Sequence, residues 1–175
     1  MRVVAGALSG RRLRAPTGLR TRPTADRVRE ALFSMLGPVE GLRALDLFAG
    51  SGALGIEALS RGALEAVFVD SDRRAVEVVR SNLAALGLDA AVHRRDAIRY
   101  LEGASGRPGF DLVFCDPPYD SAARLAGALS RLLPTVLAPE AVIVFESHKR
   151  SPLELSLPLL RERAYGDTRI ALYGG

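Results

Sequence analysis

The residues best suited to chemistry form a short acidic and aromatic turn, Asp116-Pro117-Pro118-Tyr119, directly after the apolar segment Phe110–Cys115. Its two prolines remove backbone donors and stiffen the turn, so carbonyl and carboxylate acceptors are aimed into a cleft. Acceptors that bind both hydrogens of an exocyclic base amine favour a pyramidal nitrogen whose lone pair can attack a methyl donor. We expect Asp116 to take up the released proton and Tyr119 to stack on the base. The turn therefore predicts four catalytic residues: Asp116, Pro117, Pro118 and Tyr119.

A glycine-rich turn, Gly50-Ser51-Gly52-Ala53-Leu54-Gly55, follows one predicted strand and opens a helix, with Asp70 twenty residues beyond Gly50. This spacing satisfies the dinucleotide fingerprint, so a nicotinamide enzyme is one interpretation. Asp46, four residues before Gly50, opposes it because its carboxylate would repel a pyrophosphate. S-adenosylmethionine has no phosphate and carries an ammonium and a sulfonium, so the acid attracts it by an energy on the order of a few kcal/mol. We therefore expect S-adenosylmethionine at this turn, with Gly50 and Gly52 in contact with it.

Four aspartates lie at or just past the ends of successive predicted strands: Asp46, Asp70, Asp96 and Asp116. The carboxyl edge of an open α/β sheet is where ligands bind. We expect Asp70 to accept hydrogen bonds from the two ribose hydroxyls and Asp96 to accept one from the adenine amino group. Phe48 and Ala97, which lie close by in sequence, are further cofactor candidates. A helix N-cap would explain any one of these aspartates, but four at one edge predict a ligand site.

From residue 43 onward, short apolar runs alternate with stretches of helical periodicity, which predicts βα units around a parallel sheet. The helix after the second strand has an apolar stripe, and Gly87 is placed to end it. A helix over Thr24–Leu36, with Thr24 as N-cap, is expected to lie against the sheet. Predicted strands cover residues 44–48, 66–70, 90–93, 111–115 and 141–145, followed by 161–165 and 168–173 as a hairpin about Gly166-Asp167.

The N-terminal end is strongly basic, with eight arginines in residues 1–30 against Asp26 and Glu30. Such clustering favours a polyanion partner, although a solvated face with arginine favoured by genome composition is the plainer interpretation. The RNA-binding candidates are Arg11, Arg12, Arg14 and Arg22. Residues 2–15 resemble two short strands around Leu8-Ser9-Gly10, too small for a domain and too basic for a core element.

The composition limits the remaining classes of protein. The 175 residues suit one domain, and no apolar run approaches the span of a bilayer. The apolar start is too short for a secretory signal and Cys115 is the only cysteine, so we expect a cytoplasmic protein. We also expect it to be a monomer. Cys115 is better explained by core packing than by nucleophilic catalysis. His93 and His148 lack metal-ligand spacing, so no metal is expected.

Residues 146–149, Glu-Ser-His-Lys, end the fifth predicted strand. They would either line the base pocket or form an ordinary solvated strand end, and the sequence leaves both interpretations open.

Three stretches together resemble the bacterial small-subunit ribosomal RNA guanine-N2 methyltransferases: Arg22 to Glu30, Asp46 to Gly52, and Asp116 to Tyr119. The resemblance covers nearly the whole chain. It implies a Rossmann-like class I methyltransferase sandwich whose seven-stranded sheet is mostly parallel, with the last strand antiparallel and a short N-terminal β-hairpin. It also implies that Thr24 and Arg27 lie on a helix that closes over the methionine end of the cofactor.

As a consequence of this resemblance, we expect methylation of the 2-amino group of one guanine in 16S rRNA of the assembled or assembling small subunit. We expect a single domain, residues 1–175, with a basic hairpin extension over 1–20 and the α/β core over 21–175. Three alternatives stay open: an adenine-N6 or cytosine-N4 methyltransferase acting on DNA, a nicotinamide-dependent oxidoreductase, and an RNA-binding protein without activity. The chain leaves no room for the added recognition domain that sequence-specific DNA methylation usually requires.

Overall fold

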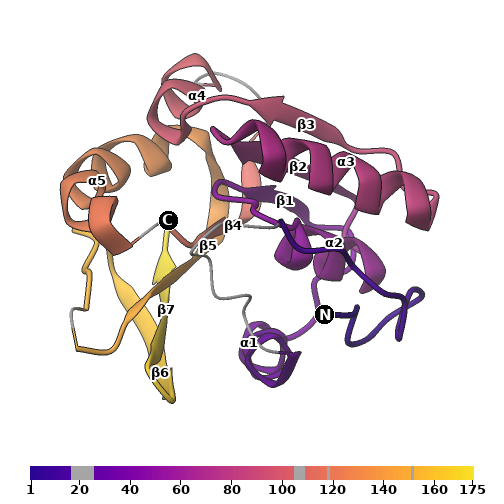
Figure 1. Cartoon of the computed structure of the whole chain (residues 1–175). Coiled ribbons are helices and arrows are strands. Elements are labelled where there is room, and N and C mark those ends of the chain that lie inside the picture. The colour runs from indigo at the N-terminus through magenta and orange to yellow at the C-terminus, as the bar shows by residue number, and fades with distance from the viewer. Residues whose placement is uncertain (17–25, 105–108, 118, 151) are drawn as a thin grey trace.

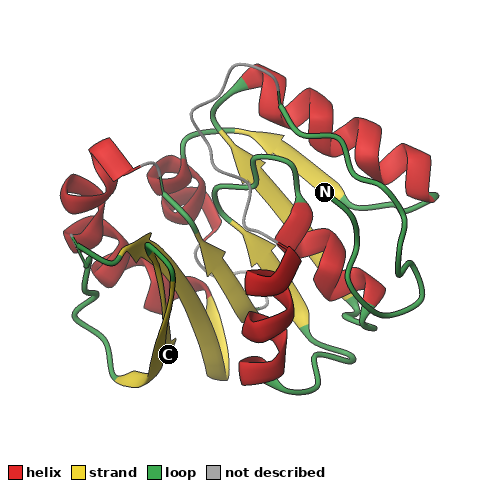
Figure 2. Cartoon of the chain, turned by 60° about the horizontal axis from the view of Figure 1, so that its bottom comes forward, coloured by secondary structure: helices red, strands yellow, loops and turns green. Residues whose placement is uncertain are grey.

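The chain folds into an open seven-stranded sheet with helices on both of its faces (Figures 1 and 2). The computed structural model describes residues 1–16, 26–104, 109–117, 119–150 and 152–175, with the backbone alone at 119–124. The strands are β1 Arg43–Asp46, β2 Glu65–Asp70, β3 Ala91–Arg94, β4 Phe110–Cys115, β5 Leu137–His148, β6 Leu159–Tyr165 and β7 Thr168–Gly174. The helices are α1 Asp26–Leu36, α2 Ala53–Ser60, α3 Arg73–Leu86, α4 Ala97–Ala104, α5 Tyr119–Leu132 and the 3-10 turn η1 Leu133–Val136.

The strand order is β3-β2-β1-β4-β5-β7-β6, and the first five strands of the chain run parallel. β7 is antiparallel to both β5 and β6, which confirms the predicted sheet and its final hairpin. The order of strands along the sheet reverses between β1 and β4. In open α/β sheets this switch point, at the carboxyl ends of the strands, is where ligands bind. We call that side of the sheet the carboxyl edge.

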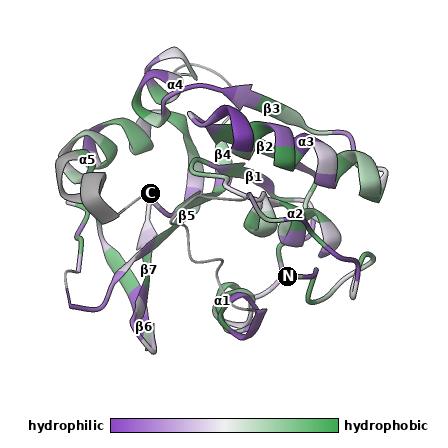
Figure 3. Cartoon of the chain, in the orientation of Figure 1, coloured by the Kyte–Doolittle hydropathy of each residue, from purple (hydrophilic) through white to green (hydrophobic). Residues whose placement is uncertain are grey.

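Two apolar clusters hold the helices on the sheet. On one face, α1, α2 and α3 cover the strands, and Phe33 of α1 packs on Phe114 of β4 with ring centroids 5.9 Å apart. On the other face, α4 and α5 contribute Leu101 and Leu129. Figure 3 shows the consequence in α3, where hydrophobic and hydrophilic bands alternate along the helix. β4 is almost continuously apolar because both of its faces are covered.

Most of the predicted elements are confirmed, with differences at their ends. α3 ends at Gly87, whose φ of 69° is the left-handed conformation expected of a glycine C-cap. β1 ends two residues earlier than predicted, yet the amides of Leu47 and Ala49 still donate to Phe114 and Val69 of the neighbouring strands. β5 begins four residues earlier than predicted because Leu137 pairs with Phe110 across an irregularity in register. The proposed N-cap of α1, Thr24, lies outside the described residues.

The N-terminal segment corrects one expectation. It has the predicted hairpin shape, although regular pairing is limited to an antiparallel bridge between Arg2 and Arg12. The expectation that it is no core element is wrong, because Val3 and Leu13 are buried in the cluster beneath α2 and α3. The arginine side chains of this segment are exposed, whereas Val3 and Leu13 between them are buried. The net charge of the segment was therefore a poor guide to the burial of its apolar residues. Figure 1 shows this segment, in indigo, beside α2 and α3.

Glu57 anchors the segment. Its fully buried carboxylate accepts hydrogen bonds from the amides of Val4 at 2.7 Å and Ala5 at 2.9 Å. The same carboxylate pairs with Arg61 at 2.8 Å. Gly6 passes so close that a Cβ there would lie 1.8 Å from the carbonyl oxygen of Ser60, which excludes any other residue. One buried acid of α2 thus fixes the basic segment to the core.

We expect Glu57→Ala to lower the free energy of unfolding by about 3 kcal/mol, because two buried amides and Arg61 lose their common acceptor. Urea denaturation measures the change. Glu77→Ala is the matched control, since Glu77 is exposed in its pair with Arg73, and it should cost less than about 1 kcal/mol. Equal losses in the two variants would contradict the anchoring role.

Candidate active site at the carboxyl edge

The glycine turn after β1 is shaped to take a ligand against its backbone. Gly52, with φ of 77°, is the N-cap of α2, and a Cβ there would lie 3.3 Å from the side chains of Phe68 and Val79. Gly50 also has a positive φ, of 54°, but faces open space, since a Cβ there would meet only the Phe48 carbonyl at 3.9 Å. The turn therefore packs closely on the protein at Gly52 and leaves its backbone accessible at Gly50.

Asp46, the last residue of β1, is buried beside this turn with 3% of its surface exposed. Its Oδ2 accepts a hydrogen bond from the amide of Gly55 at 3.1 Å, in the first turn of α2. Burial raises the pKa of Asp46 to about 7, the negative charge of Asp70 adds to the rise, and the Gly55 hydrogen bond opposes it. A carboxylate in this condition is stabilised by the arrival of a cation.

Asp70 and Asp96 lie at the next two strand ends, as predicted. Asp70 closes the glycine turn, because its Oδ2 accepts from the amide of Gly50 and its Oδ1 from that of Asp72, each at 2.8 Å. Burial is the main cause that raises the pKa of Asp70. The Oδ1 of Asp96 accepts from the amide of Arg99 at 3.1 Å, so this residue caps α4. The contacts predicted for both with ribose and adenine stay predictions.

Asp116 directly follows β4, and Glu146 of β5 is one of two acids whose charge acts on it. Cys115 pairs with Phe145 across the two strands, which brings the following residues of each strand side by side. Burial is the largest cause that raises the pKa of Asp116 well above its usual value, followed by the negative charges of Glu146 and Asp46. A carboxylate with a raised pKa accepts protons more readily, which suits the predicted role.

Glu146 is the residue that the sequence left undecided. It is buried, with 7% of its surface exposed, so the interpretation as a solvated strand end is wrong. The available signal was its place at the carboxyl end of β5, the strand that neighbours β4.

The remaining candidates are placed as follows. Phe48 is partly buried after β1, and Ala97 is buried at the start of α4. Pro117 is buried in the turn, while Tyr119 begins α5 and only its backbone is described. Arg27 is exposed on α1. Thr24, Pro118 and Arg22 lie outside the described residues.

The basic candidates Arg11, Arg12 and Arg14 are exposed on the N-terminal segment. Arg11 donates to the carbonyl of Ala85 at 3.1 Å, and Arg14 donates to the hydroxyl of Ser81 at 3.5 Å. These contacts lay both guanidinium groups along α3. The segment therefore presents a basic strip that is fixed to the folded core.

Other reactive groups are accounted for by packing. Cys115 is buried, and burial raises the pKa of its thiol, so the thiol stays protonated. His93 lies against the ring of Tyr100, with centroids 5.4 Å apart. Within the part of the chain that the structure describes, His, Cys, Asp and Glu form no group of three that could hold a metal ion.

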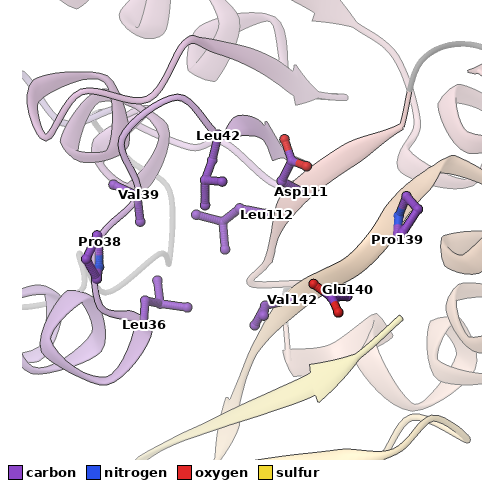
Figure 4. Close-up of a pocket in the computed structure, with 9 residues that line it drawn as sticks. All are labelled: Leu36, Pro38, Val39, Leu42, Asp111, Leu112, Pro139, Glu140 and Val142. Atoms are coloured by element: carbon purple, nitrogen blue, oxygen red, sulfur yellow. The ribbon is translucent and has the colours of Figure 1, made fainter.

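A hollow of about 260 Å³ lies near the amino end of β4, at the edge of the sheet opposite the carboxyl edge (Figure 4). It is separate from the carboxyl edge and contains none of the candidate residues. Its lining consists of Leu36, Pro38, Val39, Leu42, Asp111, Leu112, Pro139, Glu140 and Val142.

The site fits S-adenosylmethionine rather than a dinucleotide. The carboxylate of Asp70 binds the amide of Gly50, and that of Asp46 binds the amide of Gly55 at the start of α2. These anionic surroundings attract an ammonium and a sulfonium and repel a pyrophosphate. Asp46, Gly50, Gly52 and Asp70 would hold the cofactor.

Comparison with known proteins assigns the chain. The profile of a family described as Conserved hypothetical protein 95 matches residues 1–174. The chain belongs to this family. Its membership confirms the family resemblance seen in the motifs of the sequence.

Relatives in this family align over almost the entire chain. YlbH of Bacillus subtilis strain 168 is 44% identical over 184 residues, covering 99% of this chain and 98% of the relative. Ribosomal RNA small subunit methyltransferase D of Escherichia coli K12 is 38% identical, covering 99% and 89%.

One solved structure of similar fold contains a bound cofactor and a bound nucleoside. The 16S rRNA N2 G1207 methyltransferase of Thermus thermophilus, in complex with AdoMet and guanosine, superimposes with a TM-score of 0.69 at 25% identity. The match covers 91% of this chain and 45% of that protein. The fold is thus that of a class I methyltransferase, as predicted. None of the described helices has the length and apolar character needed to span a membrane.

We expect binding of S-adenosylmethionine to strengthen up to about tenfold from about pH 6 to about pH 8, because the cation requires ionised Asp46 and the pKa of that acid is raised to about 7. Calorimetric titration at several pH values measures this. Below about pH 7, binding should release a proton.

Asp46→Asn is the matched variant, since its amide oxygen can still accept from Gly55. We expect it to bind S-adenosylmethionine at least about tenfold more weakly and with a flat profile over this pH range. An unchanged pH dependence in this variant would assign the titration to another group, with Asp70 the first to test.

Proposed function

We propose that this chain transfers a methyl group from S-adenosylmethionine to the exocyclic 2-amino group of a guanine in 16S rRNA. One observation carries the proposal: a half-buried Asp116 with a raised pKa, in an Asp-Pro-Pro turn at the same sheet edge as the acidic glycine turn. The family's relatives named as ribosomal RNA small subunit methyltransferases support the substrate class. The relative bound to guanosine supports the base.

The residues of the chain act on the amine. When bound, S-adenosylmethionine supplies an electrophilic methyl group on a positively charged sulfur. Asp116 and the carbonyl of Pro117 accept the two amine hydrogens and orient the nitrogen lone pair, which lowers the entropic cost of reaction. Asp116 then accepts the proton that the methylated amine releases. Tyr119 stacks on the base.

The substrate is the 16S rRNA of an assembled or assembling small subunit, and the chain acts as a cytoplasmic monomer with one domain over residues 1–175. The basic strip of Arg11, Arg12 and Arg14 supports phosphate contacts, with Arg22 extending them. Recognition then depends on RNA shape and phosphates as much as on base edges.

The deciding experiment transfers labelled methyl groups from S-adenosylmethionine to small subunits that lack their native methylation, followed by nuclease digestion. Label in 2-methylguanine is expected. Label in adenine or cytosine would keep the mechanism at Asp116 and overturn the base. Absence of label on subunits, free RNA and DNA would favour an RNA-binding protein without activity.

Asp116→Ala should slow methyl transfer by about 10²–10⁴-fold, because both the amine acceptor and the proton acceptor are lost. Binding of S-adenosylmethionine and of rRNA should be unchanged. Asp116→Asn keeps an acceptor oxygen but takes up no proton, so its rate should lose the rise with pH that the raised pKa of Asp116 gives the wild type. Full activity in Asp116→Ala would remove this mechanism.

Arg12→Ala should weaken rRNA binding and reduce the slope of log affinity against log salt by about 0.7–0.9, as expected for one phosphate contact. Filter binding at several salt concentrations measures the slope. Arg131→Ala is the control, because Arg131 is exposed on α5, across the sheet from the basic strip. An equal change in both variants would mean that the strip has no specific contact.

A further inference from the structure

The side chains of Asp116 and Glu146 share one face of the sheet. In a strand, successive side chains alternate between faces. Phe114 and Val144 belong to the cluster under α1, whereas Cys115 and Phe145 belong to the cluster on the other face. The residues that follow Cys115 and Phe145 are Asp116 and Glu146, and their side chains therefore return to the face of α1.

The two carboxyl groups are also close, with Glu146 buried and Asp116 half-buried. Asp116 and Glu146 are the next residues after the pair Cys115 and Phe145, with which the register of β4 and β5 ends, and the negative charge of Glu146 helps to raise the pKa of Asp116. Glu146 has 7% of its surface exposed, and Ile170 of β7 is its partner across the strand pair. Carboxylate oxygens accept hydrogen bonds, so two neighbouring acids at a ligand site suit a ligand that presents adjacent donors.

Guanine presents such donors. Its Watson–Crick edge places the N1–H beside the two hydrogens of the 2-amino group, so donors occupy adjacent positions. Adenine and cytosine place a lone pair beside their exocyclic amines. Two adjacent carboxyl acceptors therefore match guanine, whereas a lone pair facing the second acceptor would be repelled and left without a hydrogen bond.

We propose that Glu146 is the specificity-determining residue of this site, accepting the N1–H of the target guanine while Asp116 binds the adjacent 2-amino group. This role rests on the proposed function and names what selects its base. Glu146 touches the base next to the reacting amine and takes no part in the transfer of the methyl group.

The test uses small subunits reconstituted with 16S rRNA that carries either guanine or 2-aminopurine at the methylated nucleotide. 2-Aminopurine keeps the 2-amino group but has a lone pair in place of the N1–H. The wild-type chain should prefer guanine by at least about 100-fold in kcat/KM. Glu146→Gln, whose amide can donate to that lone pair, should reduce this preference at least about tenfold, chiefly by losing activity on guanine.

Glu102→Gln is the matched control, since Glu102 is exposed on α4, and its preference should equal that of the wild type. Each preference is a ratio within one protein, so partial loss of folded enzyme cancels. Thermal unfolding and S-adenosylmethionine binding establish that Glu146→Gln is folded, and Glu146→Ala replaces it in the same assay if it is not.

Three results would overturn the role. The first is a wild-type kcat/KM for guanine within about threefold of that for 2-aminopurine. The second is a preference for guanine in Glu146→Gln that equals that of the wild type. The last is a folded, cofactor-binding Glu146→Gln without activity on either base. The last would place Glu146 in the transfer step instead. Failure of the proposed function is distinct, because the wild type would then form no 2-methylguanine on subunits that carry guanine.

Discussion

The structure depends on acidic groups held partly out of water where parallel strands end. Asp46 and Asp70 end β1 and β2, Asp116 directly follows β4, and Glu146 lies near the end of β5. Burial raises the pKa of the three aspartates. Desolvation and mutual repulsion make such a row costly by itself. Hydrogen bonds from the amides of Gly50, Gly55 and Asp72 offset part of this cost for Asp46 and Asp70. A cationic cofactor and a donor-rich base edge would offset more of this cost, so the acidic row is complementary to the proposed ligands.

The sheet divides this acidic row into two halves with different tasks. Asp46 and Asp70 flank the glycine turn on β1 and β2, where amides of the turn bind their oxygens. Asp116 follows β4 and Glu146 lies near the end of β5, on the other side of the point where strand order reverses. Donor and acceptor of the methyl group would thus be held by adjacent strands of one rigid sheet, with Asp46 close enough to influence Asp116. Parallel pairing of β1 with β4 sets this relation.

The N-terminal segment connects the same core to an RNA surface. A buried acid of α2, Glu57, binds its backbone, and Asn82 of α3 bonds both the amide and the carbonyl of Arg14. The arginines therefore lie on a fixed base, and less conformational entropy is lost when they meet phosphates. Asn82 also donates to the carbonyl of Ser51 in the glycine turn. The side chain of Asn82 thereby joins the basic strip to the glycine turn.

The sequence by itself determined the strands, the glycine turn, the Asp-Pro-Pro turn and the family, because each depends on local periodicity or on neighbouring residues. The alternation of short apolar runs with helical stretches predicted a parallel sheet. The negative charge of Asp46 favoured S-adenosylmethionine over a dinucleotide as the cofactor. Strand ends were less well predicted at β1 and β5, where pairing with neighbours decides the boundary. Only the tertiary structure decided that Val3 and Leu13 are core residues, that Glu57 holds the N-terminal segment, and that Glu146 is buried beside Asp116. Those contacts join residues far apart in the chain, and burial depends on what the fold packs over a side chain, which no local pattern records.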